Sequence, residues 1–395
     1  MSARTCHRAG KRRGAIVVYL VASMVVLAGF AALAVDAGRL YLGKTELQVA
    51  ADAAALAGAN ELLNERRIHG LGELAIIFQV ARQRAGAVAG SNPVLGIGPQ
   101  IDYNPANAAD GDLVIGYLPH LYNTGESISL LDPTEFNAVK VRVRRDETYN
   151  GSVALMFARA LGIETADLVA EATAAFHFGI IGFRVTPETG NASLMPLTLR
   201  ETCWDTLMGT LAGENSVYED NWAYDPLTEH VTPGQDGLPE LNLYPGSGEG
   251  QLPPGNFGTI DIGGSNNSTA DIVRQLLDGV SAEDLEYHGG ELNLSDGPIV
   301  LAGDTGLSAG MADALEAIVG QTRTIPLFSE VSGVGDTSMF TIVRFVGVRI
   351  MHVRLTGAMN KKCVMLQPAL AVDDAAIPGD GDTSTNVYHP VCLVR

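Results

Sequence analysis

The feature that most constrains this chain is an uncharged run of 21 residues close to its N-terminus, from Ala15 to Val35. At 1.5 Å of rise per residue, a helix of this length spans about 30 Å, which is the thickness of the hydrocarbon core of a bilayer. Basic residues precede the run and Asp36 follows it directly. By the positive-inside rule, this order predicts a transmembrane helix whose N-terminus lies in the cytoplasm. A cleaved secretory signal is the alternative, but its apolar part is usually only about 7–15 residues long.

The charge of the chain is divided at the same place. The formal net charge is −19, but the first thirteen residues carry +5, so the remaining 382 carry −24. An acidic body lacks the basic patch that phosphate binding requires, and we expect no nucleic-acid partner. With 46% hydrophobic and 18% charged residues, the chain has enough apolar surface to fold. We expect a single-pass protein of the inner (cytoplasmic) membrane that contacts lipid through residues 15–35, with most of the chain in the periplasm or outside the cell.

The helical pattern continues beyond the uncharged run. No proline occurs from residue 1 to residue 92, and one stripe of a 3.6-residue helix carries Leu42, Val49, Ala53, Leu56 and Leu63. A second row consists of the small residues Ala50, Ala54 and Gly58, which allow another backbone to approach closely. We therefore expect a helical stalk over residues 37–68. Its small-residue face packs either on the protein's own exported domain or on partner helices, and a homo-oligomer is one such assembly.

These N-terminal residues also resemble a known family. The segment RRGAIVVYLVASMVVLAGFAALAVDAGRLYLGKTELQVAADAAALAGA, Arg12 to Ala59, closely resembles the N-terminal segment of Tad/Flp pilus-assembly proteins of the TadE/TadG type, TadG in particular. The positions that carry the resemblance and the expected helix packing are Arg12, Arg13, Gly14, Asp36, Gly38, Arg39, Leu40, Tyr41, Gln48, Ala50, Asp52, Ala54 and Gly58. The resemblance implies a structural, non-enzymatic component that takes part in assembling or anchoring a Flp-type pilus, with other Tad, pilus or envelope proteins as partners.

One departure from the family concerns processing. In pilins and TadE-type proteins, a prepilin peptidase cuts after a glycine, and a glutamate lies five residues into the mature helix. Here Gly14 is present, but the fifth residue after it is Tyr19. The resemblance therefore favours an anchor that is not cleaved.

The remainder of the chain predicts an α+β protein with antiparallel strands. The expected organisation is a basic cytoplasmic tip (1–14), a transmembrane helix (15–36), the helical stalk (37–68), a first exported α+β domain (69–186) and a second, Gly/Pro-rich exported α+β domain (187–395). In the first domain, residues 137–144 alternate apolar and basic side chains as a half-buried strand does, and residues 153–162 are expected to form a short helix. In the second, residues 339–357 and 361–370 are expected to form a hairpin.

Two other classes of function stay open on the sequence alone. The string G-x-S-x-G around Ser308 matches the nucleophile pattern of a membrane-tethered exported hydrolase, although Ser308 reads more naturally as a helix N-cap. Tyrosine and tryptophan residues between 200 and 258 indicate an anchored surface module that binds a ligand.

No cofactor or metal is expected, because the histidines are scattered and no Cys-x-x-Cys occurs. Three of the four cysteines would be exported, and Cys363–Cys392 is the predicted disulfide among pairings that the sequence leaves open.

Overall fold

The computed structural model describes residues 13–121, 123, 125–244, 255–264, 268–333, 335–358, 361–379 and 383–394. These residues form helices and mainly antiparallel strands, which confirms the predicted α+β class. Two compact units result: the first contains Met1–Ala55, Arg84–Val114 and Lys140–Ala172, and the second contains Leu56–Gln83, Ile115–Val139 and Thr173–Arg395. The domain boundaries drawn along the sequence stay predictions, since each unit is assembled from segments that are far apart in the chain.

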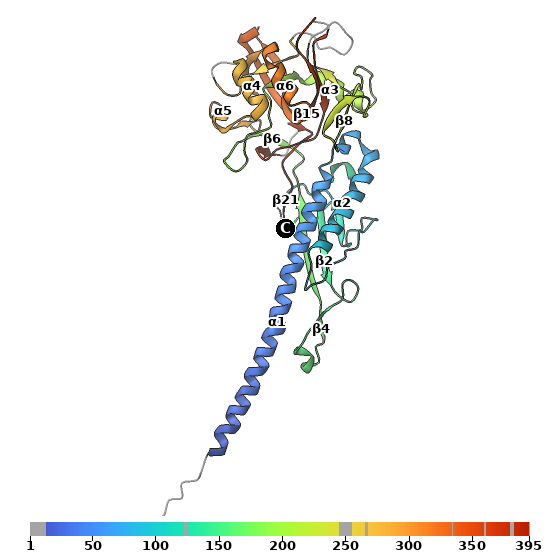
Figure 1. Ribbon diagram of the computed structural model, residues 1–395, viewed down its shortest axis with the longest axis vertical. Helices are drawn as coiled ribbons and strands as arrows, with labels where there is room; N and C mark the ends of the chain where they lie inside the picture. The colour runs from blue at the N-terminus through green and yellow to red at the C-terminus, as the bar shows by residue number, and fades with distance from the viewer. Residues whose placement is uncertain are drawn as a thin grey trace, which may run out of the picture. The chain divides into compact units, whose positions relative to one another are not determined.

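The N-terminal segment is one continuous helix, α1, from Arg13 to Leu62 (Figure 1). The absence of proline and the abundance of alanine explain its length, because nothing in the segment interrupts the hydrogen-bond ladder. The expected transmembrane helix and stalk are thus a single element. After α1, Asn64 accepts a hydrogen bond from the Arg66 N–H and begins the short 3₁₀-helix η1, Glu65–His69. The next helix is α2, Leu71–Ser91.

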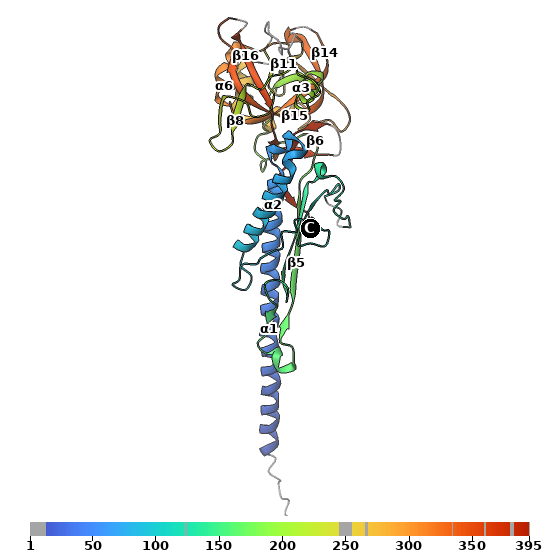
Figure 2. The same cartoon turned by 90° about the vertical axis from the view of Figure 1, so that its right-hand side faces the viewer.

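The first sheet has four strands in the order β1-β2-β5-β21. Their bounds are β1, Leu113–Gly116; β2, Ala138–Arg145; β5, Leu168–Ala175; and β21, Cys392–Leu393. In β2 the valines are buried and the basic side chains between them are half-buried, as the alternation predicts. Figure 2 shows β5 running alongside α1.

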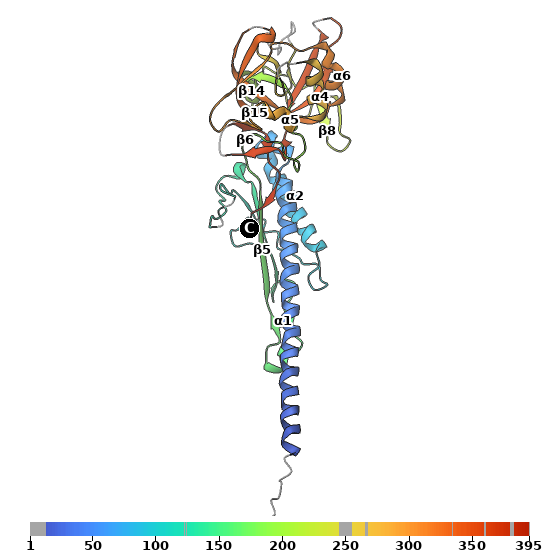
Figure 3. The ribbon, with the colours of Figure 1, turned by 90° about the vertical axis from the view of Figure 1, so that its left-hand side faces the viewer.

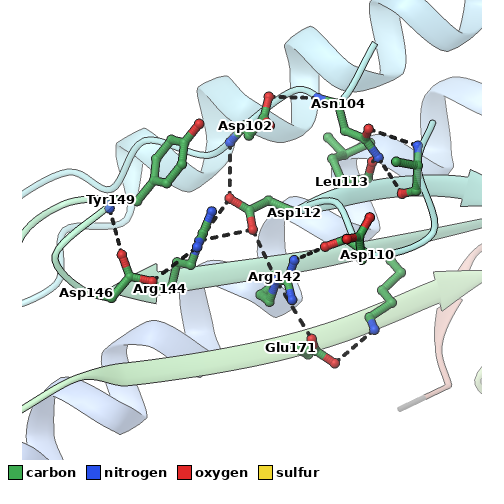
Figure 4. Close-up of polar contacts among 12 residues, drawn as sticks. Asp102, Asn104, Asp110, Asp112, Leu113, Arg142, Arg144, Asp146, Tyr149 and Glu171 are labelled. Atoms are coloured by element: carbon green, nitrogen blue, oxygen red, sulfur yellow. Dashed lines mark hydrogen bonds and ion pairs between the residues drawn. The ribbon is translucent and has the colours of Figure 1, made fainter. Parts of the chain in front are cut away.

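A polar network occupies the basic face of β2 (Figure 4). The buried Asp112 side chain lies 3.1 Å from the Nε atoms of both Arg142 and Arg144. Lys140 pairs with Glu171 of β5 at 3.0 Å. Each of these three basic side chains has a carboxylate partner. Both faces of β2 can therefore pack within the first unit.

The helix expected over residues 153–162 is wrong. This segment forms the two-residue strand β3, Val153–Ala154, and the 3₁₀-helix η3, Ala158–Leu161, followed by β4, Thr165–Ala166. Gly162 ends η3 in the left-handed region at φ 86°. Val153 and Ala154 pair with Ala166 and Thr165 as antiparallel strands, so this part of the segment is extended and not helical.

The second unit is built on an eight-stranded sheet. Its strands are β7, Leu197–Arg200; β10, Leu241–Asn242; β11, Phe257–Ile260; β13, Ile299–Asp304; β14, Thr322–Ser332; β15, Ser338–Arg354; β16, Cys363–Pro368; and β19, Ser384–Thr385. The pairings β15-β13-β11-β7-β14 close back on β15 and form a ring. Closure satisfies the backbone groups that an open edge would leave exposed. The predicted hairpin is confirmed, since β15 and β16 pair from Arg354 with Cys363 onward.

Helices and small sheets cover this ring. The helices are α3, Glu201–Leu211; α4, Thr269–Asp278; α5, Ala282–Glu286; the 3₁₀-helix η4, Ala309–Met311; and α6, Ala312–Ala317. Figure 3 shows α4 and α6 next to each other. Trp204 of α3, Leu276 of α4 and Leu315 of α6 enter one apolar core with the sheet.

A second apolar core of the same unit forms around Phe183, Phe328 and Phe340.

The small sheets are built from short strands: β6, Ile180–Phe183; β8, Trp222–Asp225; β9, His230–Pro233; β12, Leu292–Asn293; β17, Ala371–Val372; β18, Ala376–Pro378; and β20, Val387–Tyr388.

Candidate functional site

The first candidate surface is the N-terminal half of α1. Its large apolar side chains between Ile16 and Val35 are from 41% exposed, at Leu33, to 75% exposed, at Tyr19. Among the residues that the structure describes, α1 is the helix that is long and apolar enough to cross a membrane. Apolar surface in water costs about 25 cal/mol per Å². Since these large apolar side chains are exposed in the described part of the chain, the arrangement fits a single-pass membrane anchor.

Asp36 directly follows the uncharged run, and its side chain is buried, with an exposure of 4%. Its carboxylate accepts hydrogen bonds from three consecutive backbone N–H groups, those of Met156 at 2.8 Å, Phe157 at 2.8 Å and Ala158 at 2.7 Å. Hydrogen bonds to an ionised acceptor are among the strongest in proteins. This contact, which we call the Asp36 clamp, fixes the loop between β3 and η3 to the point on α1 where the uncharged run ends.

The other residues of the resembling motif divide between the two sides of α1. Gly38, Arg39 and Tyr41 are exposed and Leu40 is half-buried, with Tyr41 at 77%. No atom of another segment lies within 4 Å of the position that a Cβ of Gly38 would take. Gly38 and Tyr41 thus face away from the strands of the first unit, whereas Leu40 lies at the edge of the packed face.

The small-residue face of α1 lies inside the protein. Ala50 and Ala54 are fully buried, and Gly58 is buried as well. Of the two alternatives for this face, the structure shows packing on the chain's own domain. Gln48 adds a polar tie, because its Nε2 donates to Asp52 at 2.8 Å and to the Glu171 carbonyl oxygen of β5 at 3.0 Å.

Two positions on the same face were not singled out from the sequence. A Cβ on Gly43 would lie 3.0 Å from a methyl carbon of Leu168 and 3.1 Å from one of Leu95, so a glycine allows these side chains to approach the helix. Glu46 accepts a hydrogen bond from the Leu95 N–H at 2.6 Å. Gly43 lies seven residues before Ala50 and eleven before Ala54, a spacing that places all three on one helix face. This spacing could have identified Gly43 as part of the packed face from the sequence.

The remaining predicted positions lie at the start of the chain and among the cysteines. Arg12 falls outside the described residues, and Arg13 and Gly14 are the first two residues of α1. Of the predicted pair Cys363–Cys392, Cys363 is a free thiol in the structure. The predicted disulfide is therefore not formed, because the two residues belong to strands of different sheets.

The structure also places the residues of the two alternative sites. Ser308 is the N-cap of η4, where its hydroxyl accepts a hydrogen bond from the Gly310 N–H at 3.2 Å. Of the aromatic residues, Trp204 is buried in a core, and Trp222 stacks on His352 with ring centroids 4.4 Å apart. Tyr224 lines a cavity of about 700 Å³ together with Arg349. Within the described ranges, no group of three or more His, Cys, Asp or Glu residues is placed to hold a metal ion.

Comparison with known proteins identifies the same N-terminal segment. Residues 14–61 match the family model of Tad, Flp pilus-assembly TadE/G-like proteins. The match confirms the resemblance and its location, and it associates this protein with Flp pilus assembly. Searches of curated proteins and of solved structures gave no match.

Proposed function

We propose that this protein is a single-pass component of the inner membrane that serves the assembly or anchoring of a Flp-type pilus as a structural and interaction protein, without catalysis. One observation carries the proposal: residues 14–61, which match the TadE/G-like family model, coincide with α1 and its exposed apolar half. The five basic residues before Gly14 and Asp36 after the uncharged run favour an N-terminus in the cytoplasm and export of the rest.

The partners we propose are other Tad or envelope proteins. The small-residue face of α1 is occupied by the chain itself, so the surface open to them along the exported part of α1 is the opposite one, with Tyr41, Leu42 and Val49 at 77%, 51% and 53% exposure. Ser308 serves as a helix cap, which supports a structural role over the hydrolase alternative.

Two experiments test the proposal. In spheroplasts treated with protease, a tag placed before Met1 should stay intact, whereas one placed after Arg395 should be digested. Digestion of the N-terminal tag in intact spheroplasts would contradict the topology. Deletion of the gene should abolish or strongly reduce surface pili, and normal pili in the deletion strain would contradict the assignment to pilus assembly.

A further inference from the structure

The loop held by the Asp36 clamp exposes an unusual amount of apolar surface. Between Leu155 and Glu164, four large apolar side chains face solvent: Met156 at 60%, Phe157 at 43%, Leu161 at 68% and Ile163 at 53%. We call these four residues the apolar tip. Four exposed large apolar side chains within eight residues exceed the scattered apolar residues of an ordinary surface, and such a concentration marks an interaction site.

The clamp fixes the height of the apolar tip along α1. The N–H groups of Met156 and Phe157, two of the four tip residues, donate to Asp36, and Asp36 directly follows Val35, the last residue of the uncharged run. If residues 15–35 cross the hydrocarbon core, Asp36 lies at its boundary with the headgroups. The tip then lies at the same level, and Figure 1 shows the adjoining strand β4 beside α1.

The charged and aromatic residues around the tip suit a headgroup region. Arg159 lies within the tip segment and is exposed, and Arg39 is exposed one turn beyond Asp36. No acidic residue occurs from Met156 to Ile163. Tyr41 is the aromatic residue that membrane proteins place at this depth. Apolar side chains beside arginines are the composition of segments that rest in the interface between lipid tails and phosphates.

We propose that the apolar tip inserts into the outer headgroup region of the same bilayer that α1 spans, giving the protein a second membrane contact. The inference rests on the proposed membrane anchor. A helix alone is free to tilt and rotate in a bilayer, whereas a helix with a side contact bound through Asp36 is not. The tip thus sets the direction in which the exported face of α1 with Tyr41 and Val49 points.

The test uses the full chain in phospholipid vesicles with and without brominated lipid, which quenches tryptophan at close range. Phe157→Trp and Leu161→Trp each place a reporter in the tip, and Leu227→Trp, at a position 93% exposed in the turn between β8 and β9, is the matched control. The emission of the two native tryptophans is measured in the parent chain and subtracted. We expect the emission added at 157 or 161 to be blue-shifted and largely lost in brominated vesicles, and the emission added at 227 to be unchanged.

Equal quenching of the tip reporters and the Leu227→Trp control, in protein that floats with the vesicles, would overturn the inference and leave the anchor standing. Failure to float would overturn the anchor and the inference together. Adding Asp36→Ala to Leu161→Trp should reduce the quenching without releasing the protein from the vesicles. Unchanged quenching in that double variant would contradict the positioning role of Asp36.

Discussion

Replacing Asp36 by alanine removes the carboxylate that binds the loop between β3 and η3 to α1. The carboxylate accepts three hydrogen bonds of 2.7–2.8 Å. A hydrogen bond to a charged group changes an equilibrium constant by about tenfold or more. Water can reach two of the three N–H groups once the carboxylate is gone, because Met156 and Phe157 are exposed, whereas Ala158 is 6% exposed. We therefore expect the equilibrium constant for opening of this loop to rise roughly hundredfold. This is less than the product of the three factors that independent hydrogen bonds would give.

Hydrogen exchange of the full chain in detergent or lipid measures this opening directly. In Asp36→Ala, the amides of Met156, Phe157 and Ala158 should exchange roughly a hundred times faster than in the parent chain. Asp36→Asn, which keeps one carbonyl acceptor, should have an intermediate effect. Asp52→Ala is the matched control on the same helix, since Asp52 bonds to Gln48 instead, and it should leave these three amides unchanged. Unaltered exchange in a folded Asp36→Ala protein would refute the clamp.

The second unit supplies three further predictions. Burial raises the pKa of Glu240 to about 7, above the ordinary 4.5. The folded state therefore holds a proton between these values that the unfolded chain has lost, and the free energy of unfolding should fall by about 2–3 kcal/mol from pH 5 to pH 8. Glu240→Gln should flatten that profile in denaturant titrations, and an equally steep profile in the variant would exclude Glu240 as its source. Arg349, 4% exposed, pairs with Glu65 through both terminal nitrogens at 3.1 and 2.5 Å, so Arg349→Ala should lower the free energy of unfolding by about 2–4 kcal/mol. The control is the ion pair of the exposed Arg66 with Glu73, and Arg66→Ala should lower the free energy of unfolding by at most about 1 kcal/mol. Equal losses of stability in the two variants would contradict the role of burial. Ser308→Ala removes a cap and should cost about 0.5–2 kcal/mol while leaving surface pili unchanged, whereas loss of an esterase or peptidase activity would revive the hydrolase alternative.

The sequence predicted the parts of the fold that depend on local pattern. The continuous helix followed from 92 residues without proline, and β2 followed from the alternation of valine with Lys140, Arg142 and Arg144. The hairpin of β15 and β16 followed from two apolar runs separated by a short connection at residues 358–360. In each case, neighbouring residues alone determine the outcome.

The parts that failed depend on contacts between distant residues. Residues 153–162 read as a helix in isolation, but Val153 and Ala154 pair as a strand with Ala166 and Thr165. Asp36, 120 residues before Met156, holds the loop that follows this strand. The closed ring of strands in the second unit was not predicted either, because the parallel pairing of β7 with β14 joins residues near 199 to residues near 327. Nothing in either strand's own sequence specifies the other.

The sequence identified residues of α1 that belong to the candidate site, but it did not predict which of them face the protein's own strands. Asp36, Gln48, Ala50 and Ala54 all belong to the resembling motif, yet the sequence could not tell which side of α1 the protein's own strands would cover. The structure places these four on the inner side and leaves Tyr41 and Val49 exposed.

The most direct measurement of the central claim counts surface pili by electron microscopy in a strain that lacks this gene, with and without a plasmid that supplies the full chain. The account predicts that pili are lost or strongly reduced in the deletion strain, that the full chain restores them, and that a chain lacking residues 14–61 does not. Pili in normal number on the deletion strain would contradict it.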